Sequence, residues 1–325
     1  MRVVVTGGAG FIGSNLCRQL LDDGCRVTCL DNFSTGHRRF VERLTSRAEF
    51  EIVELDLLHG GAELARLFEG ADAVAHLAAN ADLRYGWDEP DRDLEQNVIV
   101  SHRVLEAVRA AGVPTLLFTS TGSVYGEAAV IPTPEDAPFP VQTSLYAASK
   151  VSVEAFIQAY AEKTGLRGII VRFVSVLGPH YTHGHVIDFV RSLRRDPDRL
   201  RVLGDGTQRK SYLHVDDCVA AVSRLVSSED AAGVFNLGVD DTCTVRESIG
   251  WICERLGVEP QLELTGGRRG WVGDNPHIHL AIDRILATGW SPRFSIREAV
   301  EATVDWLVDQ DWLLDVPDHA ATAGR

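Results

Sequence analysis

The sequence predicts an α/β fold in which helices cover both faces of a doubly wound parallel sheet. Short apolar segments alternate with amphipathic ones through the first half of the chain, at the spacing of strand–helix–strand units. The apolar segments are nearly continuous, which is typical of strands buried on both faces. A glycine-rich turn separates the first strand from the first helix. Together these features favour a sheet whose carboxyl edge binds a ligand.

Strands and helices are expected to alternate up to residue 173. The strands are expected at Val3–Thr6, Arg26–Leu30, Phe50–Glu54, Ala73–Leu77, Thr115–Thr119 and Gly168–Phe173. The helices are expected at Phe11–Asp22, Ala62–Phe68, Leu94–Ala111 and Tyr146–Thr164. Right-handed crossovers would bring the carboxyl ends of these strands to one edge of the sheet.

After Gly178-Pro179 the alternation becomes less regular. A polar loop is expected after the first of the later helices, and a frayed tail at the end of the chain. The later elements are expected to be a helix at Val186–Arg195, a strand and helix within Tyr212–Val226, a strand at Val234–Leu237, a helix at Val245–Leu256, a loop at Arg268–Pro276, a helix at Ile296–Asp309 and the tail at Asp315–Arg325.

The glycine-rich turn lies in the opening segment MRVVVTGGAGFIGS. Gly7 permits a tight turn, Gly10 lets the backbone approach a pyrophosphate, and Gly13 lets the helix pack closely on the strand. The helix N-terminus presents N–H groups and its positive dipole end to the phosphates. Asp31 ends the second strand, where a ribose-binding carboxylate is expected. A carboxylate there repels a 2′-phosphate, which favours NAD over NADP.

The composition excludes some classes of function. The net charge of −14 and the pI near 5.2 argue against a protein that binds nucleic acid or a membrane surface. The six cysteines form no CxxC pair, which favours buried thiols in a reducing compartment. No apolar run approaches the roughly 18 residues of a membrane span. We therefore expect a cytoplasmic protein, and we predict no metal site.

Tyr146 and Lys150 stand one helical turn apart in the segment SLYAASK, so they share a helix face. A tyrosine with its ordinary pKa of about 10 is a poor base at neutral pH, but a cation beside it stabilises the phenolate. Thr121 lies at the carboxyl end of an expected strand, where its hydroxyl can contact a substrate hydroxyl. On these residues alone, a chance pairing on the helix and hydroxyls that cap loop backbone stay open as alternatives.

Segments spread over most of the chain together carry a family resemblance. They are TGGAGFIGS (6–14), LDNFSTG (30–36), HLAAN (76–80), FTSTGSVYG (118–126), YAASK (146–150), VRFVSVLGP (171–179) and LGDGTQRKSYLHVDD (203–217). The chain resembles the extended short-chain dehydrogenase/reductases, in particular the NAD-dependent nucleotide-sugar epimerases and dehydratases, such as UDP-glucose and UDP-glucuronate 4-epimerases. The resemblance implies that Thr121, Tyr146 and Lys150 are the catalytic residues and that NAD is the cofactor.

The resemblance also implies how the chain is divided. Residues 1–176, with returns near 213–242 and 291–312, are expected to form an NAD-binding Rossmann domain. Residues 177–325 are expected to form mainly a smaller α/β domain that closes on the substrate. Relatives dimerise through the segments Leu94–Ala111 and Tyr146–Thr164, which implies a homodimer. The NAD-binding residues implied are Gly7, Gly10, Phe11, Ile12, Asp31, Asn32, Asp56, Leu57, Ala78, Ala79, Asn80, Asn97, Tyr146, Lys150 and Phe173.

The implied substrate is a nucleotide-diphosphate sugar. Lys210 stands where the family usually has a phosphate-binding arginine, and Arg269 resembles a second one. Ser175 and Ser211 replace an asparagine and an aspartate of the family pattern on the substrate side, which favours a non-standard sugar nucleotide. An arginine at position 84 suits an acidic group at C6, as in a uronate. The candidate substrate-binding residues are therefore Arg84, Thr121, Ser175, Arg191, Lys210 and Arg269.

The residues after Thr121 distinguish the reactions of the family. Its 4,6-dehydratases carry an Asp–Glu pair there and its decarboxylases a glutamate, whereas this chain has Gly122-Ser123 and no carboxylate before Glu127. The resemblance therefore implies a 4-epimerase that works through a transient 4-keto sugar. Tyr146 is expected to act as the base and Thr121 to relay the proton. Lys150 is expected to hold the nicotinamide ribose and, together with the positively charged nicotinamide ring, to lower the pKa of Tyr146.

Two alternatives stay open at this point. A reductase or a 2-epimerase could use the same scaffold, and exchange of the bound cofactor with external coenzyme would favour the reductase. A module that binds NAD without catalysing a reaction is the third hypothesis. The presence of Thr121, Tyr146 and Lys150 argues against that module, because binding alone does not require an activated phenol.

Overall fold

A seven-stranded parallel sheet is the largest layer of the protein, in the strand order β11-β6-β5-β4-β1-β2-β3. The computed structural model describes residues 1–81, 88–271 and 274–315. The strands of the sheet are β1 (Arg2–Thr6), β2 (Arg26–Asp31), β3 (Phe50–Glu54), β4 (Ala73–His76), β5 (Thr115–Thr121), β6 (Arg167–Phe173) and β11 (Gly233–Leu237). The predicted doubly wound α/β fold is confirmed.

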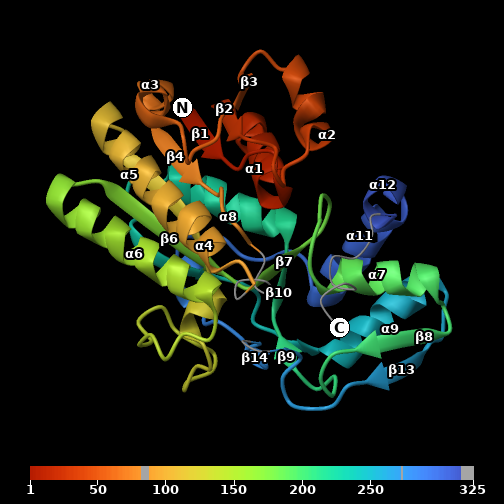
Figure 1. The fold of residues 1–325 in the computed structure, drawn as a ribbon. Helices are drawn as coiled ribbons and strands as arrows, with labels where there is room; N and C mark the ends of the chain where they lie inside the picture. The colour runs from red at the N-terminus through yellow and green to blue at the C-terminus, as the bar shows by residue number, and fades with distance from the viewer. Residues whose placement is uncertain (82–87, 272–273, 316–325) are drawn as a thin grey trace.

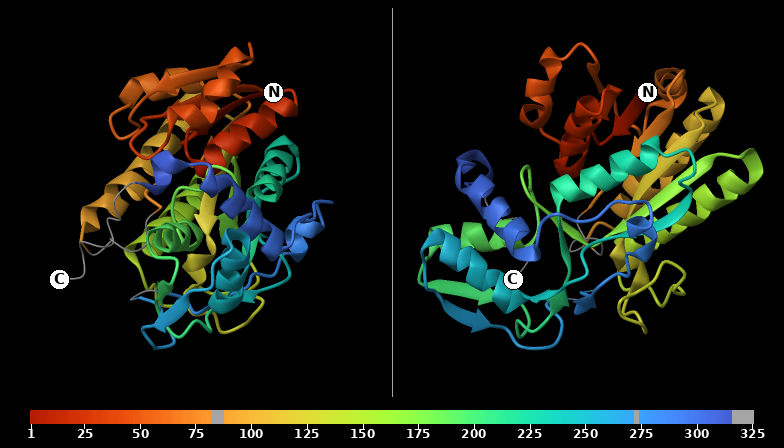
Figure 2. Two further views of the ribbon diagram at one scale, coloured as in Figure 1. Left: turned by 90° about the vertical axis from the view of Figure 1, so that its right-hand side faces the viewer. Right: turned by 180° about the vertical axis from the view of Figure 1, so that it is seen from behind.

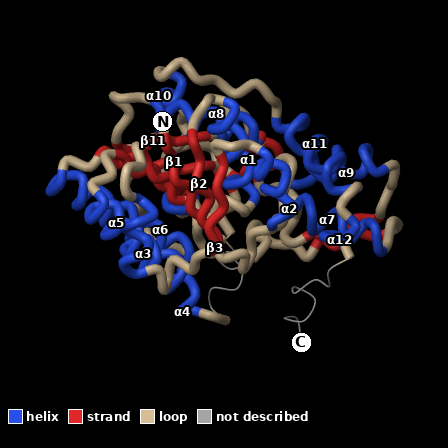
Figure 3. Tube along the Cα trace, turned by 90° about the horizontal axis from the view of Figure 1, so that it is seen from above, coloured by secondary structure: helices blue, strands red, loops and turns tan. Residues whose placement is uncertain are grey.

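Helices cover both faces of this sheet (Figures 1 and 3). Val3 and Val5 of β1 lie in the core on the face of α1 and α8, whereas Val4 packs with α5 and α6 on the other face. All three valines are fully buried, which explains why the strand is continuously apolar. The covering helices are α1 (Phe11–Asp22) and α8 (Val215–Ser227) on one face, and α3 (Gly61–Phe68), α5 (Val100–Ala111) and α6 (Leu145–Thr164) on the other.

The segment predicted as a single helix at Leu94–Ala111 differs from the prediction. The helical segment begins earlier, at α4 (Pro90–Asp93), passes through the π-helical η2 (Leu94–Ile99) and continues as α5. A proline is favoured in the first turn of a helix. In η2 the amide of Asn97 donates to the Asp93 carboxylate at 3.2 Å. Single π-helical turns of this kind occur frequently at functional sites.

A smaller α/β layer lies beside the sheet, at the lower right of Figure 1 and again in the view from behind in Figure 2. The stretch after α7, predicted as a loop, in fact contains β8, which pairs with β13 about sixty residues later. A local pattern does not reveal so distant a partner. The elements of this layer are α7 (His185–Arg195), β8 (Arg199–Val202), β9 (Arg209–Lys210), β12 (Cys243–Thr244), α9 (Val245–Leu256), β13 (Gln261–Leu264), β14 (His277–Ile278), α11 (Ile296–Val308) and α12 (Asp311–Leu314).

Short elements complete the fold. The six cysteines are free thiols, and none of the described helices is long and apolar enough to cross a membrane. Residues 316–325, for which a frayed tail is predicted, lie outside the described residues. The short elements are α2 (Arg38–Val41), η1 (Glu42–Ser46), η3 (Gly122–Tyr125), β7 (Ser175–Leu177), β10 (Tyr212–His214) and α10 (Asp283–Leu286).

Candidate active site

The glycine-rich turn joins β1 to α1 and leaves no room for side chains. Gly7 has a φ of +69°, and a Cβ there would lie 2.7 Å from the backbone nitrogen of Ala78. A Cβ on Gly13 would lie 2.1 Å from the carbonyl oxygen of Gly7. Gly10 precedes the helix, and no side chain caps its first turn. An open backbone at a helix N-terminus is the cradle that a pyrophosphate requires.

Asp31 ends β2 beside this turn and fixes its backbone. One carboxylate oxygen accepts the N–H of Ala9 at 2.9 Å and the other accepts the N–H of Phe33 at 2.8 Å. The residue is 8% exposed, and burial raises the pKa of its carboxyl. A carboxylate offers about four acceptor positions, so two of them stay available for ribose hydroxyls. The predicted residues Asn32, Asp56 and Leu57 lie at the neighbouring ends of β2 and β3.

The end of β4 is bound to η2 and α6 through two asparagines. The backbone N–H of Asn80 donates to the Asn97 side chain at 2.8 Å, and the Asn97 amide donates to the hydroxyl of Ser149 at 2.9 Å. The side chain of Asn80 donates to Asp93 at 2.9 Å. These contacts bring the predicted segment Ala78–Asn80 next to the helix that carries Tyr146 and Lys150.

Tyr146, Lys150 and Thr121 are brought together by α6 and β5. The Lys150 Nζ donates to the carbonyl oxygen of Thr119 at 3.0 Å and lies 5.7 Å from the ring centroid of Tyr146. The Tyr146 hydroxyl is hydrogen-bonded to Thr121. Thr121 in turn pairs in register with Phe173 of β6. The three predicted catalytic residues therefore form one cluster at the carboxyl edge of the sheet.

Burial is the largest influence on the pKa values of Tyr146 and Lys150 in this cluster. Burial, and secondarily the charge of Asp93, raise the pKa of the Tyr146 phenol, while the Thr121 hydrogen bond lowers it. Burial lowers the pKa of Lys150 to about 8, against the opposing carboxylates of Glu154 and Asp93. The expected lowering of the Tyr146 pKa by Lys150 is therefore not what the protein's own groups produce, because desolvation of the phenolate is the larger effect.

The predicted substrate-binding cations Lys210 and Arg269 are each paired with a carboxylate. The Lys210 Nζ lies 2.5 Å from a carboxylate oxygen of Asp274, which is 3% exposed. Arg269 forms an ion pair with Glu127, in the loop that follows η3. Ser175 is exposed at the start of β7, and Arg84 lies outside the described residues. An anion bound by Lys210 and Arg269 would share them with these two carboxylates.

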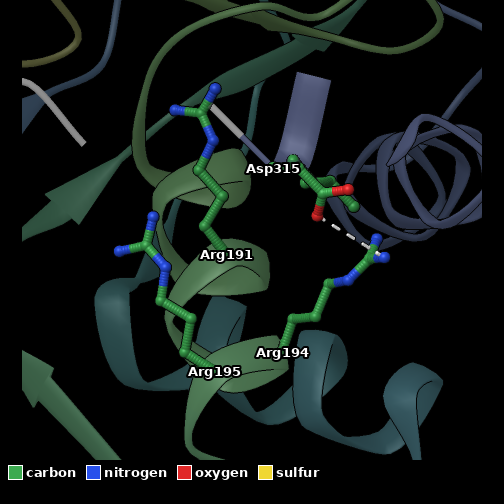
Figure 4. Close-up of a pocket in the computed structure, with 5 residues that line it drawn as sticks. Arg191, Arg194, Arg195 and Asp315 are labelled. Atoms are coloured by element: carbon green, nitrogen blue, oxygen red, sulfur yellow. Dashed lines mark ion pairs between the residues drawn. The ribbon is translucent and has the colours of Figure 1, made fainter. Parts of the chain in front are cut away.

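Arg191 lies elsewhere, on α7 against the C-terminal helix α12 (Figure 4). Its Nη2 donates to the carbonyl oxygen of Leu313 at 2.8 Å. Arg191 and Arg195 project from the same side of α7, whereas Arg194 points to Asp315 at 3.6 Å. With Leu314 these residues line a cavity of about 300 Å³. The contacts of Arg191 thus support α12, whereas Lys210 and Arg269 contact Asp274 and Glu127.

The comparison with known families agrees with this geometry. Residues 3–238 match the model of the NAD dependent epimerase/dehydratase family. The match covers most of the chain and includes the glycine-rich turn and the cluster of Thr121, Tyr146 and Lys150. The chain belongs to this family. NAD is its cofactor, and the glycine cradle, the carboxylate of Asp31 and the ammonium of Lys150 fit that molecule.

Three similar proteins place the chain within the epimerase/dehydratase family. The UDP-glucose 4-epimerase of Mycolicibacterium smegmatis is 32% identical over 314 residues, which cover 94% of this chain and 98% of the relative. A solved UDP-galactose 4-epimerase has a TM-score of 0.83 at 37% identity, covering 96% of this chain and 100% of the other. The UDP-glucuronic acid 4-epimerase of Bacillus cereus, solved with UDP-glucuronic acid and NAD, has a TM-score of 0.88 at 25% identity, covering 95% and 99%.

Sequence reasoning missed three buried polar residues next to the cluster. Asp93 precedes Asn97 by four residues, Ser149 precedes Lys150, and Glu154 follows Lys150 by one helical turn. The spacing of Asp93 and Glu154 from residues already singled out is the signal that could have found them, because residues four apart share a helix face.

Proposed function

We propose that this protein is an NAD-dependent 4-epimerase of a nucleotide-diphosphate sugar. The observation that carries the proposal is the cluster of Thr121, Tyr146 and Lys150 beside a dinucleotide cradle, in a chain similar to 4-epimerases over nearly its whole length. NAD, when bound, supplies the acceptor and later the donor of the hydride at C4, and its positive ring favours the phenolate.

The residues of the cluster have separate roles in this proposal. Tyr146 takes the proton from the 4-hydroxyl at its Oη and returns it after the sugar has presented its other face. Thr121, hydrogen-bonded to Tyr146, orients the sugar hydroxyl. Lys150 holds the ribose and contributes the positive charge that offsets the burial of Tyr146. Because the pKa of Tyr146 is raised by burial, the protein alone keeps the proton on the phenol.

The residues after Thr121 favour epimerisation over dehydration, the other activity in the family description. Gly122 and Ser123 follow Thr121, and the Ser123 N–H donates to the Thr121 hydroxyl at 3.1 Å. Glu127, the next carboxylate, is paired with Arg269. Eliminating water requires an acid and a base in addition to the tyrosine, and the segment after Thr121 offers neither.

The smaller layer is the proposed sugar-nucleotide side. We assign residues 1–176, with the return near 213–242, to NAD binding and residues 177–325 mainly to substrate binding. The segment predicted as a second return, near 291–312, contains α11, which packs on α9 and α7 of the smaller layer instead. Lys210 and Arg269 are the proposed diphosphate contacts. A lysine is a point charge and does not form the bidentate fork of an arginine. We therefore expect Lys210 to contact the diphosphate differently from the arginine that the family usually has at this position.

A panel of sugar nucleotides tests the function directly. The purified protein is incubated with UDP-, GDP-, dTDP-, CDP- and ADP-sugars, and the sugar is followed by proton NMR at C4. We expect inversion at C4 of at least one substrate without added NAD. Loss of one water by mass would instead indicate a dehydratase, and stoichiometric consumption of added reduced coenzyme a reductase.

We also propose a homodimer that forms through α5 and α6, in the cytoplasm. The two helices lie side by side (Figure 1). Ile99, directly before α5, is 36% exposed, and Phe156, on α6, is 41% exposed. Five of the six thiols are buried and all are free, which supports a reducing compartment.

Sedimentation equilibrium tests the dimer. We expect a mass about twice the 35.6 kDa of the chain, and we expect Phe156→Asp to shift it toward the monomer because a charge at the interface must be desolvated. Val308→Asp, at a residue 44% exposed on α11, is the matched control and should leave the mass unchanged. A monomeric wild-type protein would contradict the proposal.

A further inference from the structure

Glu154, one helical turn after the candidate catalytic Lys150 on α6, forms a buried ion pair with Arg172. The side chains of Glu154 and Arg172 are only 1% and 3% exposed, and Nη2 of Arg172 lies 2.5 Å from a carboxylate oxygen of Glu154. The Nε of Arg172 donates to both oxygens, at 3.0 and 3.1 Å, and the hydroxyl of Ser120 donates to the same carboxylate. Desolvating such a pair is costly, so fold stability alone does not explain it.

The pair is connected to the site in two ways. Tyr146, Lys150 and Glu154 follow one another at intervals of four residues, so they share one face of α6. Ser120 and Arg172 pair in register across β5 and β6, and each immediately precedes a residue of the candidate site. The carboxylate of Glu154 therefore joins the lysine-bearing helix to both strands that support the site.

Arg172 is itself held in place. Its Nη1 donates to the hydroxyl of Tyr125 at 2.6 Å and to the carbonyl oxygen of Glu135 at 3.0 Å. The hydroxyl of Tyr125 donates to Asn236 of β11 at 2.8 Å. These contacts hold the guanidinium in place, and the guanidinium in turn holds the carboxylate of Glu154.

The charge of Glu154 acts on Lys150 against burial. The titratable and charged groups around Lys150 are Tyr146 and Glu154 on α6, Asp93 on α4, His76 on β4 and, behind Glu154, Arg172 on β6. His76 is neutral near pH 7, because burial and Lys150 lower its pKa to about 3. Glu154 and Asp93 are the carboxylates that raise the pKa of Lys150 against desolvation.

We propose that Glu154, held by Arg172 and Ser120, is a positioning residue that keeps the ammonium of Lys150 charged and in place beside Tyr146. The proposal rests on the proposed function only for its consequence in catalysis. Its physical claim, that Glu154 keeps Lys150 protonated, concerns the protein alone and is measured without substrate.

The scarcity of lysine makes the measurement direct, since Lys150, Lys163 and Lys210 are the three lysines of the chain. Protein labelled with ¹³C-lysine gives three sets of Hε–Cε signals, assigned with Lys163→Arg and Lys210→Arg. We expect the Lys150 signal of the wild-type protein to titrate with a midpoint near pH 8. In Glu154→Gln we expect the midpoint to fall by about 1 pH unit or more, because a charge one helical turn away is lost.

Controls separate this role from a merely structural one. Glu162→Gln, at an exposed position of the same helix, should leave the Lys150 midpoint unchanged. If Glu154→Gln does not fold, the double variant Glu154→Gln/Arg172→Gln removes both charges and leaves neither unpaired. Its Lys150 midpoint should also fall. An unchanged or raised midpoint in the folded single or double variant overturns the proposal.

Activity gives a second readout where the protein epimerises a substrate. In Glu154→Gln we expect kcat to fall several-fold at pH 8 and to approach the wild-type value near pH 6, where Lys150 is protonated again. A fall that is equal at both pH values overturns the proposal. If no substrate is found, the proposed function fails, while the lysine titration still decides the role of Glu154.

Discussion

Tyr146→Phe is expected to reduce epimerisation by about a thousandfold or more while leaving NAD binding intact. The substitution removes only the hydroxyl, which is the group that moves the proton, and general acid–base catalysis contributes about 10² to 10⁴ in rate. The phenyl ring keeps its place on α6 beside Lys150. Turnover is measured by NMR at C4, and NAD affinity by titration of the intrinsic tryptophan fluorescence.

Tyr160→Phe is the matched control for this substitution. Tyr160 lies on the same helix, and its hydroxyl donates to Glu106 of α5, away from the cluster. Its loss should leave turnover within about twofold of the wild type, because this partly buried hydrogen bond joins α6 to α5 and involves none of Thr121, Tyr146 and Lys150. Tyr146→Phe with near-complete activity would show that another group moves the proton.

Gly13→Ala is expected to weaken NAD binding by about tenfold or more and to destabilise the fold by about 1–3 kcal/mol. The added Cβ would lie 2.1 Å from the carbonyl oxygen of Gly7 and 2.8 Å from the Cα of Gly8. Both are backbone atoms, so the turn itself must move. The same fluorescence titration and urea-induced unfolding measure the two effects.

Gly250→Ala controls for the general effect of replacing a helical glycine. Gly250 lies in α9, and a Cβ there meets no atom within 4 Å. We expect this variant to be more stable by about 0.5–1 kcal/mol, because alanine loses less backbone entropy in a helix. NAD affinity unchanged in Gly13→Ala would mean that the turn does not hold the pyrophosphate.

The parts of the site that could be predicted from sequence depend on local spacing. The turn at Gly7–Gly13 and the helix-face pair of Tyr146 and Lys150 are each contained in one short segment, and the structure places each as expected. The sheet could be predicted for a similar reason, because its strands are continuously apolar. These features need no knowledge of what lies opposite in space.

The rest depends on partners distant in the sequence. The pairing of β8 with β13, the contact of Arg191 with Leu313 and the pairing of Arg269 with Glu127 each join segments far apart. Whether the pKa of Tyr146 is raised or lowered depends on how deeply the phenol is buried, and the spacing of residues along a helix does not reveal that depth. The basic residues could therefore be listed from the sequence, but their contacts could not be predicted from it.

The position of β11 late in the sequence has a consequence for how the protein unfolds. β11 lies at the edge of the main sheet beside β6, yet the chain reaches it only after it has built α7, β8 and β9 in the smaller layer. The chain therefore passes from the main sheet to the smaller layer and back again. A fragment ending near residue 177 would lack β11 and would expose the edge of β6. The two layers should therefore unfold together, so that NAD bound to one layer also protects the other layer from proteolysis.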